Sequence, residues 1–358
     1  MADQRLDVAV VGGGVIGLAI ARELHGRRVR VAVFERTAIG AGASGVQPGG
    51  VRQQWGTPVA CRLARESAAF YAEADEQLEA PFPLGFRACG YLFIAHTEAT
   101  LARLASNVAV QKAEGIPSRI VTPDEAAELV PGLSTDTITG GAWCGEDGYF
   151  DRPQAVVEVF ARGLDIRIGA IDSLEPKLAD TIVVAAGAAT ADLLHPLGID
   201  LPIEREDRFL FLSEPVRERL LEPLVVSAER RFAAKQLGDG RVLTSDLGAR
   251  GDESQRETWR ANVRAGIDEL LPALAYVPFP VLVRGEYDVT PDHQPILGRV
   301  ADGLYVAAGF SGHGFMIAPA VARIVADAVT GVPADETLGI LDLARFEENR
   351  PVPEPQLV

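Results

Sequence analysis

Three glycines near the beginning of the chain, Gly12, Gly14 and Gly17, have the spacing of a phosphate-binding turn. They follow an apolar run over residues 6–11 that is too short for a helix, and a second apolar run comes after an amphipathic segment. This order predicts a strand, a turn, a helix and a second strand. In such a unit Gly12 makes the turn, Gly14 lets a pyrophosphate approach the backbone at the helix N-terminus, and Gly17 lets the helix pack on the strand.

Glu35 ends the second apolar run, which covers residues 29–34. A carboxylate at the end of this strand accepts hydrogen bonds from the ribose hydroxyls of an adenosine, and it disfavours a 2′-phosphate. The sequence therefore predicts NAD or FAD rather than NADP. A glycine-rich turn in a packed α/β domain is the alternative, but the glycines lie between two predicted strands and the acid is in place.

The composition limits the partners and the compartment. The chain has 358 residues, a net charge of −16 and a pI near 4.8, so we expect two domains and no nucleic acid partner. Cys61, Cys89 and Cys144 lie far apart without metal-ligand spacing, which predicts reduced thiols, a cytoplasmic protein and no metal site. The first strand begins by about Leu6, which leaves no room for a signal peptide. No apolar run reaches the roughly 18–20 residues of a membrane span, so we expect no membrane partner.

Distant glycine-rich segments are expected to complete the nucleotide-binding unit. Residues 37–55 contain five glycines, which suggests backbone close to a ligand; a floppy surface loop is the alternative. Residues 181–187 and 303–308 predict buried strands that rejoin the first sheet. Residues 309–314 then lead into an apolar helix over 315–329, and two such helix N-termini suit an extended dinucleotide.

The segments in between predict a second lobe and several helices. Short alternating runs predict strands of a mostly antiparallel sheet at 90–94, 209–212, 232–236 and 241–247. Start and stop signals predict helices over 57–78, 97–114, 122–131, 153–161 and 254–271. The tail, residues 350–358, is rich in proline and is expected to be irregular.

Five segments occur in one order along the chain: the N-terminal glycines with Glu35, and residues 49–54 (GGVRQQ), 183–187 (VVAAG), 290–298 (TPDHQPILG) and 309–315 (GFSGHGF). Together they resemble the FAD-dependent amine oxidases related to D-amino acid oxidase, most of all the glycine oxidase and sarcosine oxidase branch. The resemblance implies an α/β fold, with a Rossmann-like FAD-binding domain and a discontinuous substrate domain of mostly antiparallel β-sheet plus helices. It assigns residues 1–80, 142–205 and 281–358 to the FAD-binding domain, and 81–141 and 206–280 to the substrate-binding domain.

The resemblance also implies where FAD binds, with the adenosine on Glu35 and the isoalloxazine between the two lobes. The expected cofactor-binding residues are Gly12, Gly14, Val15, Ile16, Gly17, Glu35, Arg36, Ser44, Gly49, Gly50, Val51, Ile171, Ala186, Gly187, Gly285, Gly312, His313, Gly314, Phe315 and Met316. Covalent attachment in the family uses a Cys near the T-P-D segment or a His near the early glycine loop. Neither residue type stands there, so we expect non-covalent FAD.

The chain departs from the family pattern where a substrate carboxylate would bind. Glycine and D-amino acid oxidases carry an arginine where this chain has Tyr287, and monomeric sarcosine oxidases carry a lysine where it has Met316. Arg52, in the early glycine loop, is therefore the expected carboxylate receptor, with a hydrogen bond from Tyr287. Pairing of Arg52 with an internal acid is the alternative.

Two further residues have expected roles at the flavin. Lys235 is one of three lysines in the chain and is expected to promote reaction with dioxygen; a solvated strand lysine is the alternative. His313 is expected to contact the flavin pyrimidine edge, and a satisfied polar residue in a turn is its alternative. Residues 164–180 are shorter than in the family, where a hairpin usually lies between the equivalents of Glu175 and Leu178.

These features predict an FAD-dependent oxidase of a secondary amine or amino acid, such as an N-substituted glycine. Hydride leaves the carbon next to nitrogen for flavin N5, water hydrolyses the imine, and dioxygen is reduced to hydrogen peroxide; the products are glyoxylate or a keto acid and an amine. The alternatives are a dehydrogenase subunit of a hetero-oligomer, a tRNA-modifying flavoprotein domain and an NAD-binding structural module. The oligomeric state stays open.

Overall fold

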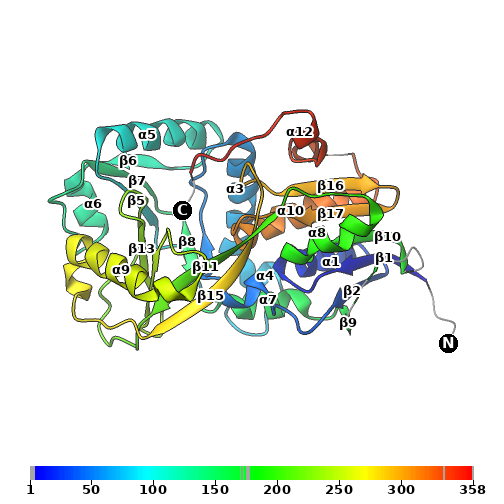
Figure 1. The fold of residues 1–358 in the computed structure, drawn as a ribbon, viewed down its shortest axis with the longest axis horizontal. Helices are drawn as coiled ribbons and strands as arrows, with labels where there is room; N and C mark the ends of the chain where they lie inside the picture. The colour runs from blue at the N-terminus through cyan, green and yellow to red at the C-terminus, as the bar shows by residue number, and fades with distance from the viewer. Residues whose placement is uncertain (1–4, 170, 172, 175–177, 334, 357–358) are drawn as a thin grey trace.

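The computed structural model of the chain has two main β-sheets that lie side by side, each with its own helices (Figure 1). It describes residues 5–169, 171, 173–174, 178–333 and 335–356. Within these residues, one sheet has six strands and the other eight, and we call each sheet with its helices the first lobe and the second lobe. The predicted α/β fold, with a Rossmann-like part and a mostly antiparallel part, is confirmed.

The sheet of the first lobe consists mainly of parallel strands. Its order is β16 (Ile296–Ala301), β17 (Leu304–Ala308), β10 (Ala179–Val184), β1 (Leu6–Val11), β2 (Val31–Glu35) and β9 (Asp165–Ile168). All neighbours are parallel except β16 and β17. Both faces of β1 are buried from Val8 to Val11, which explains the unbroken apolar sequence of these four residues. The predicted return of residues 181–187 and 303–308 to this sheet is confirmed, and β9 and β16 add an edge on either side.

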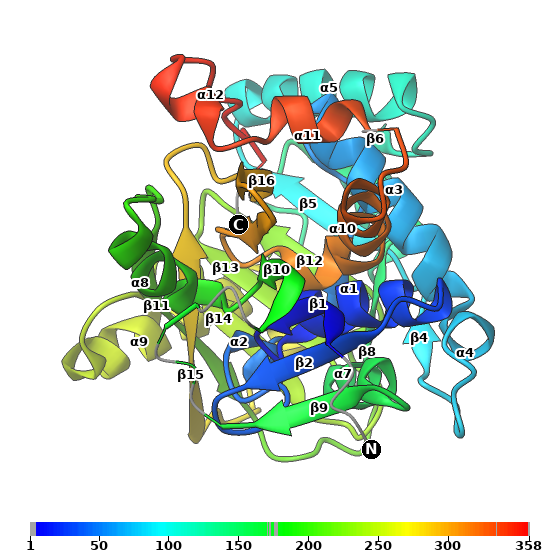
Figure 2. The same cartoon turned by 90° about the vertical axis from the view of Figure 1, so that its right-hand side faces the viewer.

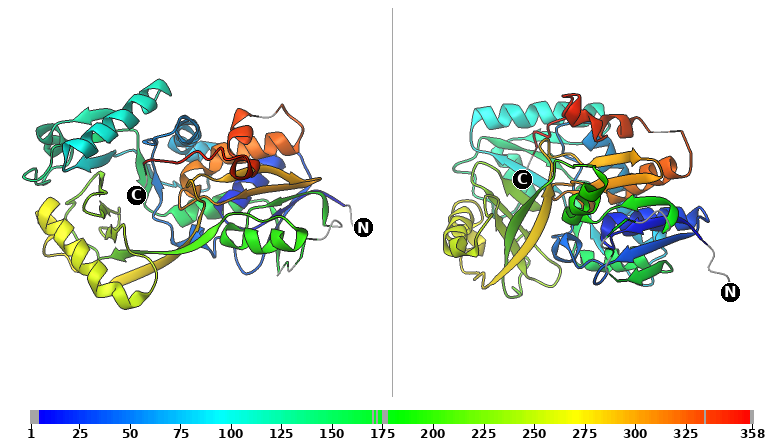
Figure 3. Two further views of the ribbon diagram at one scale, coloured as in Figure 1. Left: turned by 45° about the horizontal axis from the view of Figure 1, so that its top comes forward. Right: turned by 45° about the vertical axis from the view of Figure 1, so that its right-hand side comes forward.

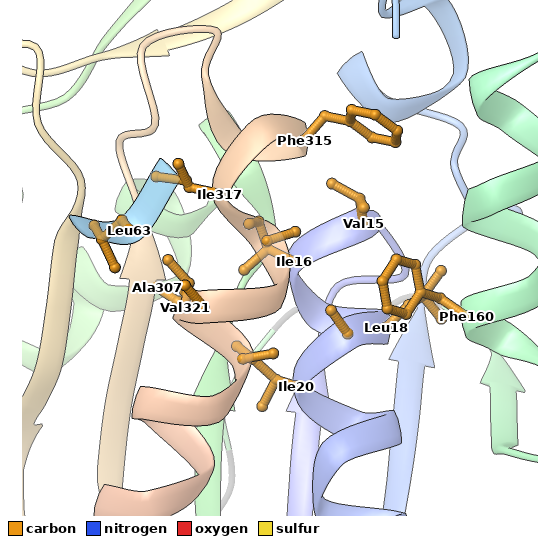
Figure 4. Packing of buried hydrophobic residues seen from close by; sticks show 14 of the residues in the cluster. Val15, Ile16, Leu18, Ile20, Leu63, Phe160, Ala307, Phe315, Ile317 and Val321 are labelled. Atoms are coloured by element: carbon orange, nitrogen blue, oxygen red, sulfur yellow. The ribbon is translucent and has the colours of Figure 1, made fainter. Parts of the chain in front are cut away.

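Helices cover both faces of the first sheet. On one face α1 (Val15–Gly26) packs against α10 (Gly314–Val329), and α8 (Thr190–Leu194) lies on the other face (Figure 2). Ile16 and Ile20 point from α1 toward α10, whereas Leu18 points toward Phe160 (Figure 4). Phe160 belongs to α7 (Pro153–Ala161), which has the predicted bounds.

The sheet of the second lobe is mostly antiparallel. Its order is β15 (Val281–Val289), β11 (Glu204–Leu212), β14 (Val242–Asp246), β13 (Phe232–Gln236), β12 (Leu224–Ser227), β5 (Tyr91–Ala95), β7 (Gly140–Cys144) and β6 (Arg119–Val121). Only β12 and β5 pair in parallel among these described strands. The long strands β11 and β15 run from beside α9 (Arg256–Leu270) toward the first lobe (Figure 3).

The two faces of the second sheet have different surroundings. Phe209 of β11 stacks on Trp259 of α9, with ring centres 4.5 Å apart, and Phe211 is buried in the same cluster. Helices α5 (Glu98–Ala113) and α6 (Pro123–Leu129) also cover parts of this sheet. Because side chains alternate along a strand, Arg208 and Leu210 project from the opposite face of β11.

Smaller elements complete the fold. Strands β3 (Gly50–Val51), β8 (Gly148–Phe150) and β4 (Phe86–Arg87) form a third sheet, and the short helices are α2 (Ala43–Val46), α4 (Ala74–Gln77), α11 (Glu336–Ile340) and α12 (Ala344–Glu347). The predicted helix over residues 57–78 is two helices, α3 (Pro58–Ala72) and α4, because Glu73 between them leaves helical dihedral angles. Within the described residues, no helix combines the length and the apolar character needed to cross a membrane.

The strand pairing differs from the predicted domain boundaries in two places. β15 pairs along its whole length with β11 in the second sheet, although the predicted FAD-binding domain includes residues 281–289. β7 pairs with β5, so the predicted boundary at residue 142 falls inside a strand of the second sheet. Residues 175–177, where the family's hairpin is expected to be missing, lie outside the described residues.

The C-terminal tail is irregular, as predicted, yet two of its side chains, those of Glu354 and Gln356, are buried. Glu354 is 3% exposed and accepts a hydrogen bond from the Thr57 hydroxyl at 2.8 Å. Gln356 is 4% exposed, and its Oε1 accepts from Asn107 Nδ2 of α5 at 2.6 Å. The tail therefore connects the second lobe to the residues that begin α3.

Candidate active site

A cavity of about 690 Å³ lies between the two lobes and is lined by residues of both. On the side of the first lobe it meets the N-termini of α1 and α10 and the ends of β2 and β10. On the other side it meets the face of the second sheet that points away from α9. The four expected catalytic residues line it: Arg52, Lys235, Tyr287 and His313. Of the expected cofactor-binding residues, all except Gly17, Gly49 and Val51 also line it.

The turn between β1 and α1 has the geometry expected of its glycines. Gly12 has φ +118°, and a Cβ atom there would lie 2.2 Å from the carbonyl oxygen of Ala185. A Cβ atom on Gly17 would lie 2.0 Å from the carbonyl oxygen of Gly12. Gly14 is different, since its Cβ atom would meet only Ser44 Oγ, at 3.3 Å, and the Ser44 Oγ accepts from Val15 N at 2.9 Å. Gly14 therefore leaves the helix N-terminus open to the cavity.

Both helices that point at the cavity begin without an acidic residue. In the described structure neither α1 nor α10 has a side-chain cap at its N-terminus, and the first turn of each has no acid. The partial positive charge at the N-terminus of each helix is therefore not offset by an acid of the helix itself. Glu35 stands beside the N-terminus of α1, where its Oε2 accepts from Gly13 N and its Oε1 from Thr37 N, both at 2.8 Å.

Tyr287 and His313 both lie at the N-terminus of α10, Tyr287 against Gly312 and His313 as the N-cap residue. Gly312 has φ +86°, and a Cβ atom there would lie 2.1 Å from Tyr287 Cε2, so only glycine admits this ring. The His313 ring packs edge-on against Trp55 with centres 4.4 Å apart. Burial, together with the charge of Arg52, lowers the pKa of His313 well below its usual value, which keeps the imidazole neutral.

Lys235 lies on β13 and is fully buried. Its Nζ donates to the carbonyl oxygen of Pro48, just before the Gly49-Gly50 pair, and lies 4.2 Å from the centre of the Tyr149 ring. Burial lowers the pKa of Lys235 to about 7, although Asp151 opposes this shift. A solvated strand lysine, the alternative in the sequence analysis, is therefore wrong, and contact with the flavin stays a prediction.

Arg52 is buried, at 1% exposed, and its terminal nitrogens are engaged. Nη1 donates to the carbonyl oxygen of Gln54 at 2.9 Å, Nη2 donates to that of Gln356 at 3.0 Å, and the guanidinium lies 3.8 Å above the Trp55 ring. Its partners are carbonyls rather than the internal acid of the alternative. This geometry does not support Arg52 as a carboxylate receptor, because the side chain is almost inaccessible from the cavity and its two Nη atoms already hold the loop and the tail. That role stays a prediction.

Tyr91 and Arg208 are among the cavity-lining residues that sequence reasoning missed. A Cβ atom on Gly50 would lie 2.2 Å from Tyr91 Oη, so the tyrosine reaches the early glycine loop through a glycine. Tyr91 stands in a wholly buried strand, where no alternation of polarity marks it. Arg208 alternates with the buried Phe209, and this period of two was the signal that could have found it.

Comparison with known protein families identifies the family to which the chain belongs. A model of the FAD dependent oxidoreductase family matches residues 7–328. The chain belongs to this family. A glycine oxidase of Geobacillus kaustophilus is 28% identical over 91% of this chain and 93% of its own. FAD-dependent oxidoreductase domain-containing protein 1 of Bos taurus is 26% identical over 91% and 81%, respectively.

Solved structures of FAD-dependent oxidoreductases have the same fold. L-proline dehydrogenase from P. horikoshii has a TM-score of 0.89 at 25% identity, covering 96% of this chain and 98% of its own. Glycine oxidase from Geobacillus kaustophilus has a TM-score of 0.85 at 26% identity, covering 95% and 99%. The protein is therefore an FAD-dependent oxidoreductase that acts on amino acids or amines, and FAD is its cofactor.

The residues of the first lobe fit FAD. The N-termini of α1 and α10, which have no acid in their first turns, suit the negative charge of a pyrophosphate and of a reduced flavin. The open backbone at Gly14 leaves room for phosphate, and the Glu35 carboxylate keeps lone pairs for ribose hydroxyls. These residues would hold the cofactor, and the face of the second sheet remains for the substrate.

Proposed function

We propose that the protein is an oxidase of a secondary amine or amino acid, such as an N-substituted glycine or a larger secondary amino acid, with dioxygen as electron acceptor. FAD, when bound, takes the hydride from the carbon next to nitrogen and passes two electrons to dioxygen, which leaves as hydrogen peroxide. Water then hydrolyses the imine to a carbonyl compound, glyoxylate for an N-substituted glycine, and an amine. The observation that carries the proposal is Lys235, a fully buried lysine that lines the cavity.

Lys235 has a pKa of about 7, so its protonated form is available near neutral pH and supplies positive charge in a place from which water is excluded. Dioxygen gains negative charge as it is reduced, and a buried ammonium group stabilises that charge more strongly than an exposed one would. The Pro48 carbonyl and the Tyr149 ring hold the ammonium in position. Lys235 is therefore the residue that we expect to distinguish an oxidase from a dehydrogenase.

The N-terminus of α10 and the neutral His313 have a second role. The free N–H groups at the start of α10 favour negative charge on the side of the cavity they face. Because its pKa is lowered, His313 is neutral and adds no charge of its own to that of the helix N-terminus. Its imidazole can still form a hydrogen bond. The ring packs on Trp55, which fixes its orientation.

A second candidate is a dehydrogenase that passes electrons to a partner protein. The observation that favours it is the likeness to the L-proline dehydrogenase structure, with its TM-score of 0.89. Oxygen consumption and hydrogen peroxide should be measured with the purified chain and glycine, sarcosine, N-ethylglycine, proline and D-alanine. Peroxide equal to the oxygen consumed supports the oxidase. Bleaching of the flavin by a substrate without oxygen uptake would overturn it in favour of the dehydrogenase.

A further inference from the structure

The face of the second sheet that lines the cavity is mostly apolar. Its apolar members, which we call the sheet floor, are Leu210, Leu224, Val226, Ala233, Leu243 and Val283. They alternate along their strands with residues that pack toward the helices, so the period of two places them on one face. Such a surface gains stability when it covers an aliphatic group.

Arg208 lies at the edge of the sheet floor. It is opposite Gly285 across the β11 and β15 pair, so no side chain on the neighbouring strand occupies the space beside it. Its guanidinium lies 5.6 Å from the centre of the Tyr287 ring. Tyr287 in turn packs on Gly312 at the start of α10, so Arg208 adjoins the part of the cavity that both lobes share.

The side chain of Arg208 is accessible to a ligand in the cavity. It is 22% exposed, whereas Arg52 is 1% exposed, and its Nη1 donates to the carbonyl oxygen of Leu247 at 3.1 Å. Its counter-charge, Glu206, lies 3.2 Å from Nη2 and is shared with Arg250, whose Nη1 is 2.9 Å away. Two guanidinium groups share one carboxylate, so Glu206 alone cannot neutralise both. An accessible guanidinium that shares its counter-charge with a second arginine can pair with the carboxylate of a ligand.

We propose that Arg208, rather than Arg52, receives the carboxylate of the substrate, and that the sheet floor covers an aliphatic substituent larger than methyl. The substrate class is then an amino acid with an aliphatic side chain, N-substituent or ring, which an apolar floor distinguishes from glycine and sarcosine. The assignment rests on the proposed function for the reaction that the substrate undergoes. Binding of a carboxylate at Arg208 and of an aliphatic group on the sheet floor can be tested separately from that reaction.

The test measures binding of compounds that have no amine and so cannot be oxidised. Isothermal titration of the FAD-loaded protein with 3-methylbutanoate, 3-methylbutanamide and acetate gives three dissociation constants. We expect the carboxylate to bind at least about tenfold more tightly than its amide, and acetate to bind at least about tenfold more weakly than 3-methylbutanoate. Equal binding of acid and amide overturns the role of Arg208, and equal binding of acetate overturns the role of the sheet floor.

Three variants assign the effect to Arg208. Arg208→Gln should lose the preference for the acid, and Arg208→Lys should keep part of it. The matched control is Arg284→Gln on β15, since Arg284 is 58% exposed, pairs with Asp207 and does not line the cavity among its described residues. FAD content confirms folding of each variant. Loss of the preference in Arg284→Gln, or its retention in Arg208→Gln, overturns the proposal. If binding follows this pattern while no amine yields peroxide, only the proposed function has failed.

Discussion

Tyr71 donates its hydroxyl hydrogen bond to the carbonyl oxygen of Phe315 at 2.6 Å, and the two rings stack with centres 5.2 Å apart. In an α-helix the carbonyl oxygen of Phe315 would accept from the N–H of residue 319. Residue 319 is a proline and has no N–H to donate. Tyr71 therefore satisfies the one carbonyl that Pro319 leaves free in the first turns of α10, next to the cavity.

Tyr71→Phe should lower the free energy of unfolding by about 1–3 kcal/mol, because a buried carbonyl loses its donor. Urea denaturation of the FAD-loaded protein measures the change. Tyr276→Phe is the matched control, since Tyr276 is 66% exposed and its variant should leave the midpoint unchanged. A Tyr71→Phe protein as stable as the wild type contradicts this account of α10.

Lys235 should make stability depend on pH. Its folded pKa of about 7 lies below its ordinary value of 10.5, so the unfolded chain binds more protons between these two values. The contribution of Lys235 to the free energy of unfolding therefore rises with pH from about 7 to 10.5, and below pH 7 burial of its charge destabilises the fold. Lys235→Met should remove this dependence and stabilise the protein at pH 6. Parallel stability profiles for both proteins would contradict it.

Lys235→Met should also slow the reaction with dioxygen more than the reduction by substrate, by about 10- to 100-fold if the charge acts as proposed. Stopped-flow absorbance measures the two half-reactions separately, with and without oxygen. Lys112→Met on α5, which does not line the described cavity, is the control. An equal effect on both half-reactions would make Lys235 a structural residue.

The sequence predicts best the parts of this fold that depend on local pattern. The turn at Gly12, Gly14 and Gly17 and the end of β2 at Glu35 follow from short-range spacing, and Gly12, Gly14 and Glu35 line the cavity as expected. The burial of Arg52 was beyond prediction, because its partner Gln356 comes from a tail about 300 residues away whose composition indicates no structure. The place of β15 in the second sheet likewise depends on pairing with a distant strand.

Arg345 should hold the tail through a buried ion pair. Its Nε and Nη2 donate to Asp292 at 2.9 and 3.0 Å, both side chains are nearly inaccessible, and Asp292 Oδ2 also accepts from Val352 N. Arg345→Met leaves the Asp292 charge buried and unpaired, so we expect the free energy of unfolding to fall by about 3–5 kcal/mol. Arg350→Met, at a partly exposed ion pair with Glu348, is the control and should change it little.

The same ion pair predicts acid sensitivity. Burial raises the pKa of Asp292, but the hydrogen bonds from Arg345 outweigh it and hold the pKa below 3.8. The stability from this carboxylate is therefore present above 3.8 and is lost as the pH falls through the lowered value. In Arg345→Met this loss should disappear from the urea midpoints measured on the acid side, and an unchanged acid profile would count against the pair.

Arg52→Gln separates the two arginines at the cavity. If Arg52 holds the loop and the tail through the carbonyls of Gln54 and Gln356, the variant should lose about 1–3 kcal/mol of unfolding free energy. It should also lower kcat/KM for an acid substrate and for its uncharged amide by the same factor, because a displaced loop affects both alike. If Arg52 instead receives the carboxylate, as the sequence alone suggested, the loss falls on the acid substrate and the amide is spared. Arg208→Gln provides the comparison, since it should reduce the acid's kcat/KM selectively. A selective loss of kcat/KM for the acid substrate in Arg52→Gln, with no such loss in Arg208→Gln, would show that Arg52 of the early glycine loop receives the carboxylate.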